Sequence, residues 1–116
     1  MAREARIEQA FRAHCENVLG VPTVKWGDSG WPDRIVLVPG GKPLFIEFKV
    51  PGAAPKPRQG FRKQCLEIWG YDVEVHDNTA EAIRSVTRRL EAARLTRQTS
   101  QAENISRANF NAPKET

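Results

Sequence analysis

The sequence predicts an α/β protein, a small sheet flanked by helices with the element order α-β-β-β-α-β-α. Two patterns indicate this class. In three segments apolar residues recur every three or four positions, the period of an amphipathic helix, and between them lie short apolar runs bounded by Gly and Pro, which is typical of strands. The chain has 116 residues, enough for one domain. We assign this domain to residues 1–95 and a polar C-terminal extension to residues 96–116.

The N-terminal half is expected to contain one helix and three strands. The helix spans residues 3–19 and ends at Gly20, a residue common at helix ends. Its stripe consists of side chains three or four residues apart: Glu4, Ile7, Phe11, His14 and Val18. A strand over residues 21–26 precedes a loop, and a hairpin follows, with arms over residues 30–38 and 44–50 joined by a Pro-Gly-Gly-Lys turn.

The C-terminal half is expected to contain two helices and one strand. Three prolines in residues 51–57 predict an extended connector. A helix over residues 58–69 follows, with an apolar side of Phe61, Cys65, Ile68 and Trp69, and then a strand over residues 71–76. Asn78 and Glu81 have the spacing of a capping box, which predicts the start of the last helix. Beyond Thr96 few apolar residues remain, so we expect a frayed segment or one that docks on a partner.

The chain is basic, with a net charge of +4 and a pI of about 9.4. This charge is compatible with a polyanionic partner but does not by itself identify one. The sequence contains no apolar run of about 20 residues, the length of a transmembrane helix, and residues 1–6 lack the apolar segment of a secretory signal. We therefore expect a cytoplasmic protein.

Three charged residues lie within the predicted hairpin: Asp33, Glu47 and Lys49. Since side chains alternate along a strand, Glu47 and Lys49 share one face, and pairing of the two arms brings Asp33 close to them. Two carboxylates about 4 Å apart repel each other by roughly 4 kcal/mol at an effective dielectric near 20, and a divalent cation turns this repulsion into attraction. We therefore predict that Asp33, Glu47 and the backbone carbonyl of Phe48 bind Mg²⁺ or Mn²⁺ beside a scissile phosphate.

Lys49 is predicted to orient the attacking water or to stabilise the anionic transition state. An alternative stays open, because Glu-x-Lys is common on solvated sheet faces, where ion pairs across strands contribute roughly a few tenths of a kcal/mol. Pro-Asp at the start of one strand, combined with Glu-x-Lys in the next, favours the catalytic interpretation.

These motifs resemble a known family. Gly30-Trp31-Pro32-Asp33, Ile46-Glu47-Phe48-Lys49 and Gln59 are similar to the VRR-NUC domain of the PD-(D/E)xK nuclease superfamily, a resemblance that covers residues 4–86. It implies a restriction-endonuclease-like core with a small mixed sheet, and cleavage of DNA phosphodiesters that depends on Mg²⁺, for which Mn²⁺ substitutes. Stand-alone members of this size are similar to phage-type proteins that form homodimers and act on branched DNA, including Holliday junctions. A phage-encoded protein in the cytoplasm of a bacterial host is therefore expected.

Carried over by position, the resemblance implies that Asp33 and Glu47 are metal ligands, that Lys49 is the catalytic lysine, and that Gln59 orients Lys49 or contacts substrate. It also implies a glutamate on the first helix, which both Glu4 and Glu8 match. We favour Glu4, because it lies on the stripe that faces the sheet, whereas Glu8 is expected to meet solvent.

Basic residues gather around the start of the second predicted helix: Lys56, Arg58, Arg62 and Lys63. Because helix N-termini attract phosphate, we predict that this cluster binds DNA, and that Trp31 either packs in the core or stacks on DNA. The sequence therefore favours a structure-selective DNA endonuclease that works as a homodimer. The alternatives are a DNA-binding module without catalysis, an RNase, and a nuclease that needs a partner subunit.

Overall fold

The computed structural model describes residues 2–53 and 57–111, with side chains as far as residue 108. Within these residues four strands form one sheet in the order β1-β2-β3-β4, and their bounds are β1 (Thr23–Lys25), β2 (Arg34–Val36), β3 (Leu44–Phe48) and β4 (Asp72–His76). β1, β2 and β3 are antiparallel neighbours, and β4 is parallel to β3. The predicted α/β class with a small mixed sheet is confirmed.

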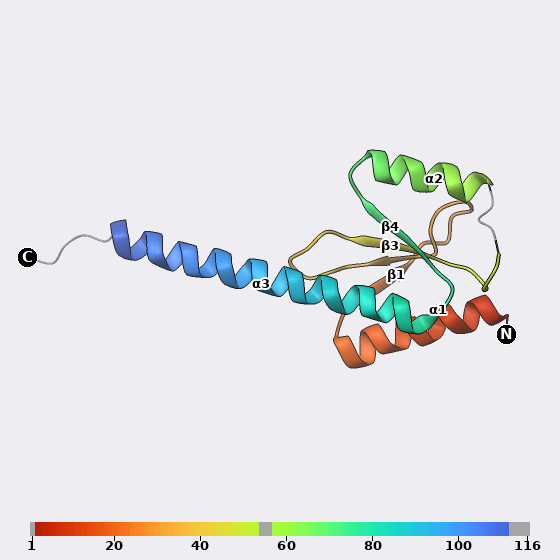
Figure 1. The fold of residues 1–116 in the computed structure, drawn as a ribbon, viewed down its shortest axis with the longest axis horizontal. Coiled ribbons are helices and arrows are strands. Elements are labelled where there is room, and N and C mark those ends of the chain that lie inside the picture. The colour runs from red at the N-terminus through yellow and green to blue at the C-terminus, as the bar shows by residue number, and fades with distance from the viewer. Residues whose placement is uncertain (1, 54–56, 112–116) are drawn as a thin grey trace, which may run out of the picture.

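Helices cover both faces of the sheet (Figure 1). α1 (Arg3–His14) and α3 (Thr79–Asn111) lie together on one face, and α2 (Pro57–Ile68) lies on the other. The core lies between the sheet and the α1–α3 pair, and its largest fully buried side chains include Phe11, Val21, Val36, Leu44, Ile46, Phe48 and Val86. Because side chains alternate along β3, the residues between these core positions, Phe45 and Glu47, point toward the α2 side.

The end of α1 differs from a regular helix. It continues into a π-helical turn, η1 (Cys15–Leu19), which stops at Gly20 with a left-handed φ of 67°. A π turn changes the helical phase, so Leu19 packs against the core and Val18, which was predicted on the stripe, is exposed. The predicted stop at Gly20 is confirmed.

α2 lies where it was predicted, but its apolar side does not pack on the sheet. Leu66 is its buried residue, whereas Phe61, Ile68 and Trp69, which were predicted as part of the apolar side, are 59%, 81% and 62% exposed. The inner side is more polar and includes Gln59, which reaches the charged residues of β3. Since a buried charge is costly without hydrogen-bond partners, these contacts turn the polar side of α2 inward.

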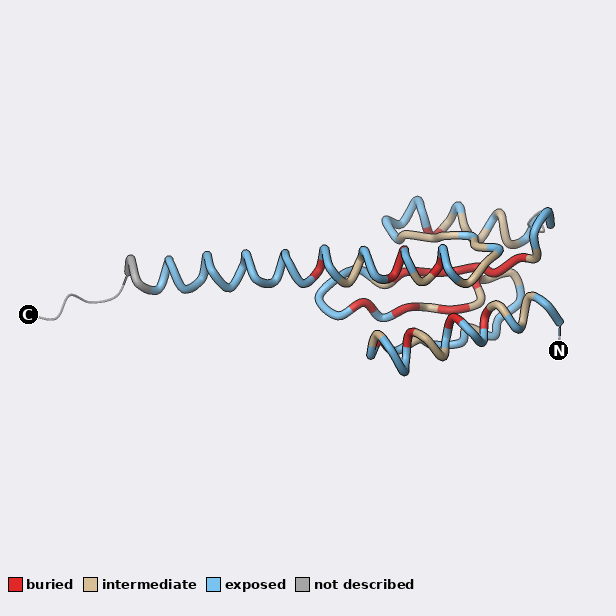
Figure 2. Tube along the Cα trace, turned by 60° about the horizontal axis from the view of Figure 1, so that its bottom comes forward, coloured by how far each residue is buried: buried red, intermediate tan, exposed pale blue. Residues whose placement is uncertain are grey.

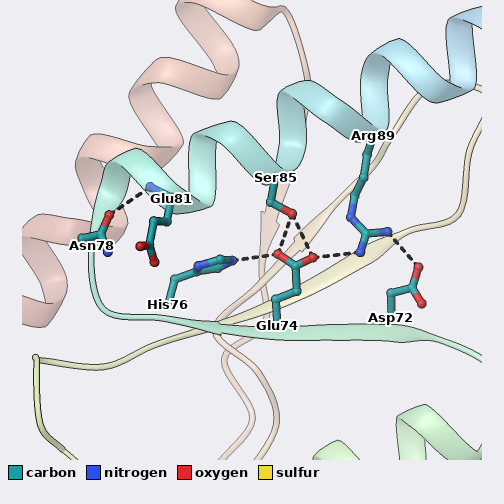
Figure 3. Close-up of polar contacts among 7 residues, drawn as sticks. All are labelled: Asp72, Glu74, His76, Asn78, Glu81, Ser85 and Arg89. Carbon is teal, nitrogen blue, oxygen red and sulfur yellow. Dashed lines mark hydrogen bonds and ion pairs between the residues drawn. The ribbon is translucent and has the colours of Figure 1, made fainter.

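Polar contacts fix α3 on β4 (Figure 3). Glu74 accepts hydrogen bonds from the Ser85 hydroxyl at 2.6 Å and from Arg89 Nη2 at 2.8 Å, and His76 Nε2 lies 2.7 Å from the same carboxylate. Arg89 also donates to Asp72 at 2.8 Å. Burial by itself would raise the pKa of Glu74, but its hydrogen-bond partners outweigh burial and lower the pKa to about 2. The carboxylate therefore stays ionised at neutral pH and holds the helix in place.

α3 is longer than predicted. Asn78 Oδ1 accepts a hydrogen bond from the Glu81 N–H at 2.9 Å, as the capping pattern predicted. The helix then runs without a break across the predicted boundary between residues 95 and 96 and reaches Asn111. Of the two alternatives for this segment, fraying is therefore wrong for the described residues, and docking on a partner stays a prediction. Beyond Ala93 every described side chain is exposed, and the helix projects from the rest of the protein (Figure 2). Residues 79–111 contain no Gly or Pro to end it.

None of the described helices combines the length and the apolar character that crossing a membrane requires.

Candidate active site

The three charged residues of the hairpin meet at one end of the sheet. Asp33 directly precedes β2, and its Oδ2 accepts a hydrogen bond from the Phe48 N–H at 2.8 Å. Glu47 and Lys49 are only 4% and 7% exposed, and Lys49 Nζ lies 3.4 Å from Glu47 Oε1. Because the N–H and C=O of one strand residue point to the same edge, the Phe48 carbonyl faces the same side as Asp33. Its role as a metal ligand stays a prediction.

Glu4, Asp33 and Glu47 form an acidic cluster, in which one carboxylate oxygen of each residue lies within 4.8 Å of the others. Glu4 comes from the first turn of α1. Burial and the negative charge of Asp33 raise the pKa of Glu47 to about 7, although Lys49 acts in the opposite direction. Close carboxylates repel each other unless a cation lies among them, and carboxylate oxygens are the ligands that Mg²⁺ and Mn²⁺ prefer. The residues therefore fit a divalent cation.

Gln59 lies between the lysine and the buried glutamate. Its Nε2 donates a hydrogen bond to Glu47 Oε1 at 2.7 Å, and its Oε1 accepts one from Lys49 Nζ at 2.6 Å. A single amide thus compensates both buried charges and holds the ammonium in one position. The geometry fits the orienting role that the resemblance implies for Gln59.

Glu8 lies apart from the acidic cluster and is buried, so the expectation that it meets solvent is wrong. It accepts a hydrogen bond from Lys25 Nζ at 2.7 Å, and Arg34 Nε lies 3.0 Å from its carboxylate. Lys25 and Arg34 are paired neighbours on β1 and β2. Two positive charges from adjacent strands therefore compensate the burial of Glu8 and leave Glu4 as the helix glutamate next to Asp33 and Glu47.

Comparisons with known proteins assign the chain to a family. No protein-family model matches the chain. It is 35% identical over 80 residues to a protein named putative nuclease p44 from Acyrthosiphon pisum secondary endosymbiont phage 1, with 67% of this chain and 86% of that protein covered. Its fold is similar to a solved VRR_NUC domain, with a TM-score of 0.64 and 25% identity over 75% of this chain and 97% of that chain. The chain belongs to the VRR-NUC family.

A second solved structure has the same VRR-NUC fold. It is a VRR_NUC domain protein that matches with a TM-score of 0.65 and 16% identity, over 78% of this chain and 90% of that chain. The family and the fold implied by the sequence motifs are therefore confirmed.

The basic cluster predicted to bind DNA is divided in this VRR-NUC chain. Lys56 lies outside the described residues. Lys63 forms an ion pair with Glu67 at 2.7 Å on the helix surface, and the Arg62 guanidinium lies over the Trp31 ring, 4.4 Å from its centroid. Trp31 is partly buried, so it belongs to the wall of the site rather than to the core.

A cleft of about 420 Å³ opens directly beside the acidic cluster. It lies between the loop over residues 26–31 and the start of α2, and its lining includes Asp33 of the acidic cluster and Gln59, which contacts Glu47 and Lys49. Arg58, the remaining member of the basic cluster, lines it as well. The sequence interpretation did not include Trp26, which stacks on Trp31 at a centroid distance of 4.5 Å. The available signal was a Gly-Asp-Ser-Gly loop between two tryptophans and next to Asp33.

Proposed function

We propose that this chain is a structure-selective DNA endonuclease that requires Mg²⁺ or Mn²⁺ and hydrolyses phosphodiester bonds. One observation carries the proposal: three carboxylate oxygens within 4.8 Å of one another lie next to a buried ammonium held by an amide at 2.6 Å. Negative charges that face a phosphate weaken binding unless a cation joins them, so the cluster favours catalysis over a DNA-binding module. The name of the phage relative, putative nuclease p44, agrees with this function.

Each residue of the site has a distinct task in this reaction. Glu4, Asp33 and Glu47 hold the divalent cation, together with the Phe48 carbonyl. When bound, the cation supplies a water of lowered pKa and a positive charge beside the phosphate. The Lys49 ammonium would orient the attacking water and stabilise the negative charge that develops on the phosphate. Gln59 is a positioning residue, because it acts by holding Lys49 and touches no reacting atom.

A cleavage panel tests the function through removal and exchange of the metal. The substrates are a supercoiled plasmid and labelled Holliday junction, flap, duplex and RNA, each with Mg²⁺, Mn²⁺, Ca²⁺ or EDTA. We expect branched DNA to be cut with Mg²⁺ or Mn²⁺ and to be bound but not cut with Ca²⁺, whose coordination is larger and less regular. Binding without cutting in Mg²⁺ and Mn²⁺ would instead favour the DNA-binding module, and preferential cutting of RNA would favour an RNase.

We further propose that the protein acts as a homodimer on branched DNA such as Holliday junctions. Large apolar side chains are exposed on α2 and in the segment that follows it: Phe61, Ile68, Trp69, Tyr71 and Val75. A group of large exposed apolar side chains is typical of a protein interface. A second copy is the simplest partner, because in a two-fold contact each copy covers the same patch of the other. Two copies also supply one acidic cluster for each of two strands.

Charge on the outer face of α2 is expected to separate the dimer. Ile68→Glu and Trp69→Glu place a carboxylate in the centre of the apolar contact and should weaken association by about 100-fold or more. Size-exclusion chromatography with light scattering measures the mass. Val18→Glu is the matched control, since Val18 is also 66% exposed but lies on η1. An unchanged dimer mass in both α2 variants would show that the interface lies elsewhere.

A further inference from the structure

Apart from Asp33, the side chains that line the cleft beside the acidic cluster have no task in metal binding. Its volume of about 420 Å³ lies within the range of small-ligand sites. Asp33 and Gln59 line it on the side of the acidic cluster, and Lys25, the loop over residues 26–31 and Arg58 complete the lining. A group bound in this cleft therefore lies directly next to the catalytic residues.

One wall of the cleft is aromatic and held from several sides. Trp26 and Trp31 stack with 17° between their planes, and Arg62 covers Trp31 at 4.4 Å. Trp26 also packs against Phe45 on β3, with 5.6 Å between the ring centroids. These contacts join the loop to the sheet and to α2. The side chains of the wall are therefore already held in place, and ligand binding does not have to pay the entropy cost of ordering them. Because Trp26 and Arg62 cover the ring of Trp31, the wall offers a base or a sugar mainly the edges of the two tryptophan rings, within a lining that is otherwise polar.

Another wall carries a positive charge. The Arg58 stem lies across Gly30, where an added Cβ would clash with Arg58 Cγ and Cδ, and its guanidinium donates to Ser29 Oγ at 3.3 Å. Among the residues that the structure describes, Arg58 forms no ion pair, so its charge is available to a phosphate. Lys25 lines the cleft as well, but its ammonium is paired with Glu8. The first turn of α2 adds the positive end of a helix dipole.

We propose that this cleft binds one unpaired nucleotide of a DNA strand, with the base or sugar against the tryptophan wall and a phosphate at Arg58. The proposal rests on the proposed nuclease function. It assigns the selectivity for branched DNA to this cleft. A base pair stacked within a duplex cannot enter a cleft of this size. A nucleotide at a branch point, in a flap or in a single strand leaves its stack at low cost and can enter.

Gly27 allows the cleft to be blocked without disturbing the fold. It lines the cleft, and a Cβ at this position would meet no heavy atom within 4 Å, so Gly27→Phe adds bulk in open space. Gly27→Ala changes the same position without filling the cleft and is the matched control. Arg58→Ala removes the phosphate-binding group, and Arg12→Ala, at an exposed position of α1, is the control for the lost charge.

The experiment measures binding by fluorescence anisotropy in Ca²⁺, with a labelled duplex, the same duplex carrying a short single-stranded flap, and a dT oligonucleotide. We expect the wild type to bind the flap and the oligonucleotide roughly tenfold more tightly than the duplex. Gly27→Phe and Arg58→Ala are expected to lose this preference and to keep the affinity for duplex within about threefold, because the remaining phosphate contacts are unchanged. Gly27→Ala and Arg12→Ala are expected to keep the preference.

Equal affinity of the wild type for duplex and flap would overturn the proposal. It would also be overturned if both cleft variants bound the flap with the same affinity as the wild type. Melting curves establish that each variant is folded, and Arg58→Ala provides the comparison on its own if Gly27→Phe unfolds. Because binding is measured without cleavage, the two hypotheses fail separately. Selective binding without cleavage in Mg²⁺ or Mn²⁺ refutes the nuclease function alone, whereas cleavage without selective binding refutes the nucleotide site alone.

Discussion

Asp33→Asn is expected to reduce DNA cleavage by about 10³-fold or more while leaving DNA binding nearly intact. Asn has the shape of Asp and can still accept the hydrogen bond that the Phe48 N–H donates at 2.8 Å, so the hairpin keeps its geometry. The variant loses the negative charge that attracts the cation together with Glu47. In EDTA its DNA binding is expected to tighten, because one charge that repels phosphate has been removed.

Lys49→Ala is expected to reduce cleavage by about 10²- to 10⁴-fold, the usual contribution of a positioned proton-transfer or electrostatic group. Single-turnover rates in Mg²⁺ and in Mn²⁺ measure the loss of cleavage in Asp33→Asn and in Lys49→Ala. Fluorescence anisotropy in Ca²⁺ measures the DNA binding of each variant. Asp77→Asn is the matched control for charge, because Asp77 lies on the exposed turn between β4 and α3. Cleavage at the wild-type rate by either site variant would refute the role assigned to that residue.

The stability of the protein is expected to depend on pH and metal through Glu47. Burial and the charge of Asp33 raise the pKa of Glu47 from the ordinary value of 4.5 to about 7. A carboxyl group whose pKa is raised in the folded state stabilises that state only when protonated, so the stability of the metal-free protein is expected to fall as the pH rises from about 4.5 to about 7. A divalent cation binds the ionised carboxylate, and it should restore the lost stability above about pH 7.

Thermal unfolding between about pH 5 and pH 8, with EDTA, Mg²⁺ or Ca²⁺, measures this linkage. We expect the melting temperature to fall with pH in EDTA and to rise by about 4–8 °C on addition of metal at the upper end of the range. Glu47→Gln keeps an acceptor for Gln59 Nε2, so it should fold, lose most of the metal response and be about 1–3 kcal/mol more stable than the metal-free wild type at about pH 8. Glu67→Gln, on the exposed side of α2, is the control. A wild type that shows no response to metal at this pH would contradict the metal site.

Local sequence patterns were sufficient to predict the helices and strands and the charged residues of the candidate site. Alternation along β3 predicts that Glu47 and Lys49 share a face, and the antiparallel register of β2 and β3 places Asp33 opposite Glu47 when it is extended by one pair. Asn78 is recognisable as a helix cap from its residue type and its spacing to Glu81. Each of these features depends on residues that are close in sequence or on a single hairpin.

The direction in which α2 faces was not available from the sequence. Its apolar period is real, but a period defines a stripe and not the surface that the stripe contacts. The hydrogen bonds of Gln59 to Glu47 and Lys49 turn the polar side inward and leave Ile68 and Trp69 in solvent. The contacts that decide the orientation of α2 join residues 10 and 12 positions apart, on different elements. The periodicity of a single helix cannot predict such contacts.

By itself, therefore, the sequence determined the α/β class, the hairpin and the charged residues that it brings together. Only the tertiary structure decided that Glu4 rather than Glu8 joins Asp33 and Glu47, because Glu8 meets Lys25 of β1 and Arg34 of β2. It also decided that a cleft between Trp31 and Arg58 adjoins the acidic cluster. The physical reason is the same in both cases: the partner of a charged or aromatic side chain depends on how distant elements pack, whereas alternation and capping depend on the backbone of one element.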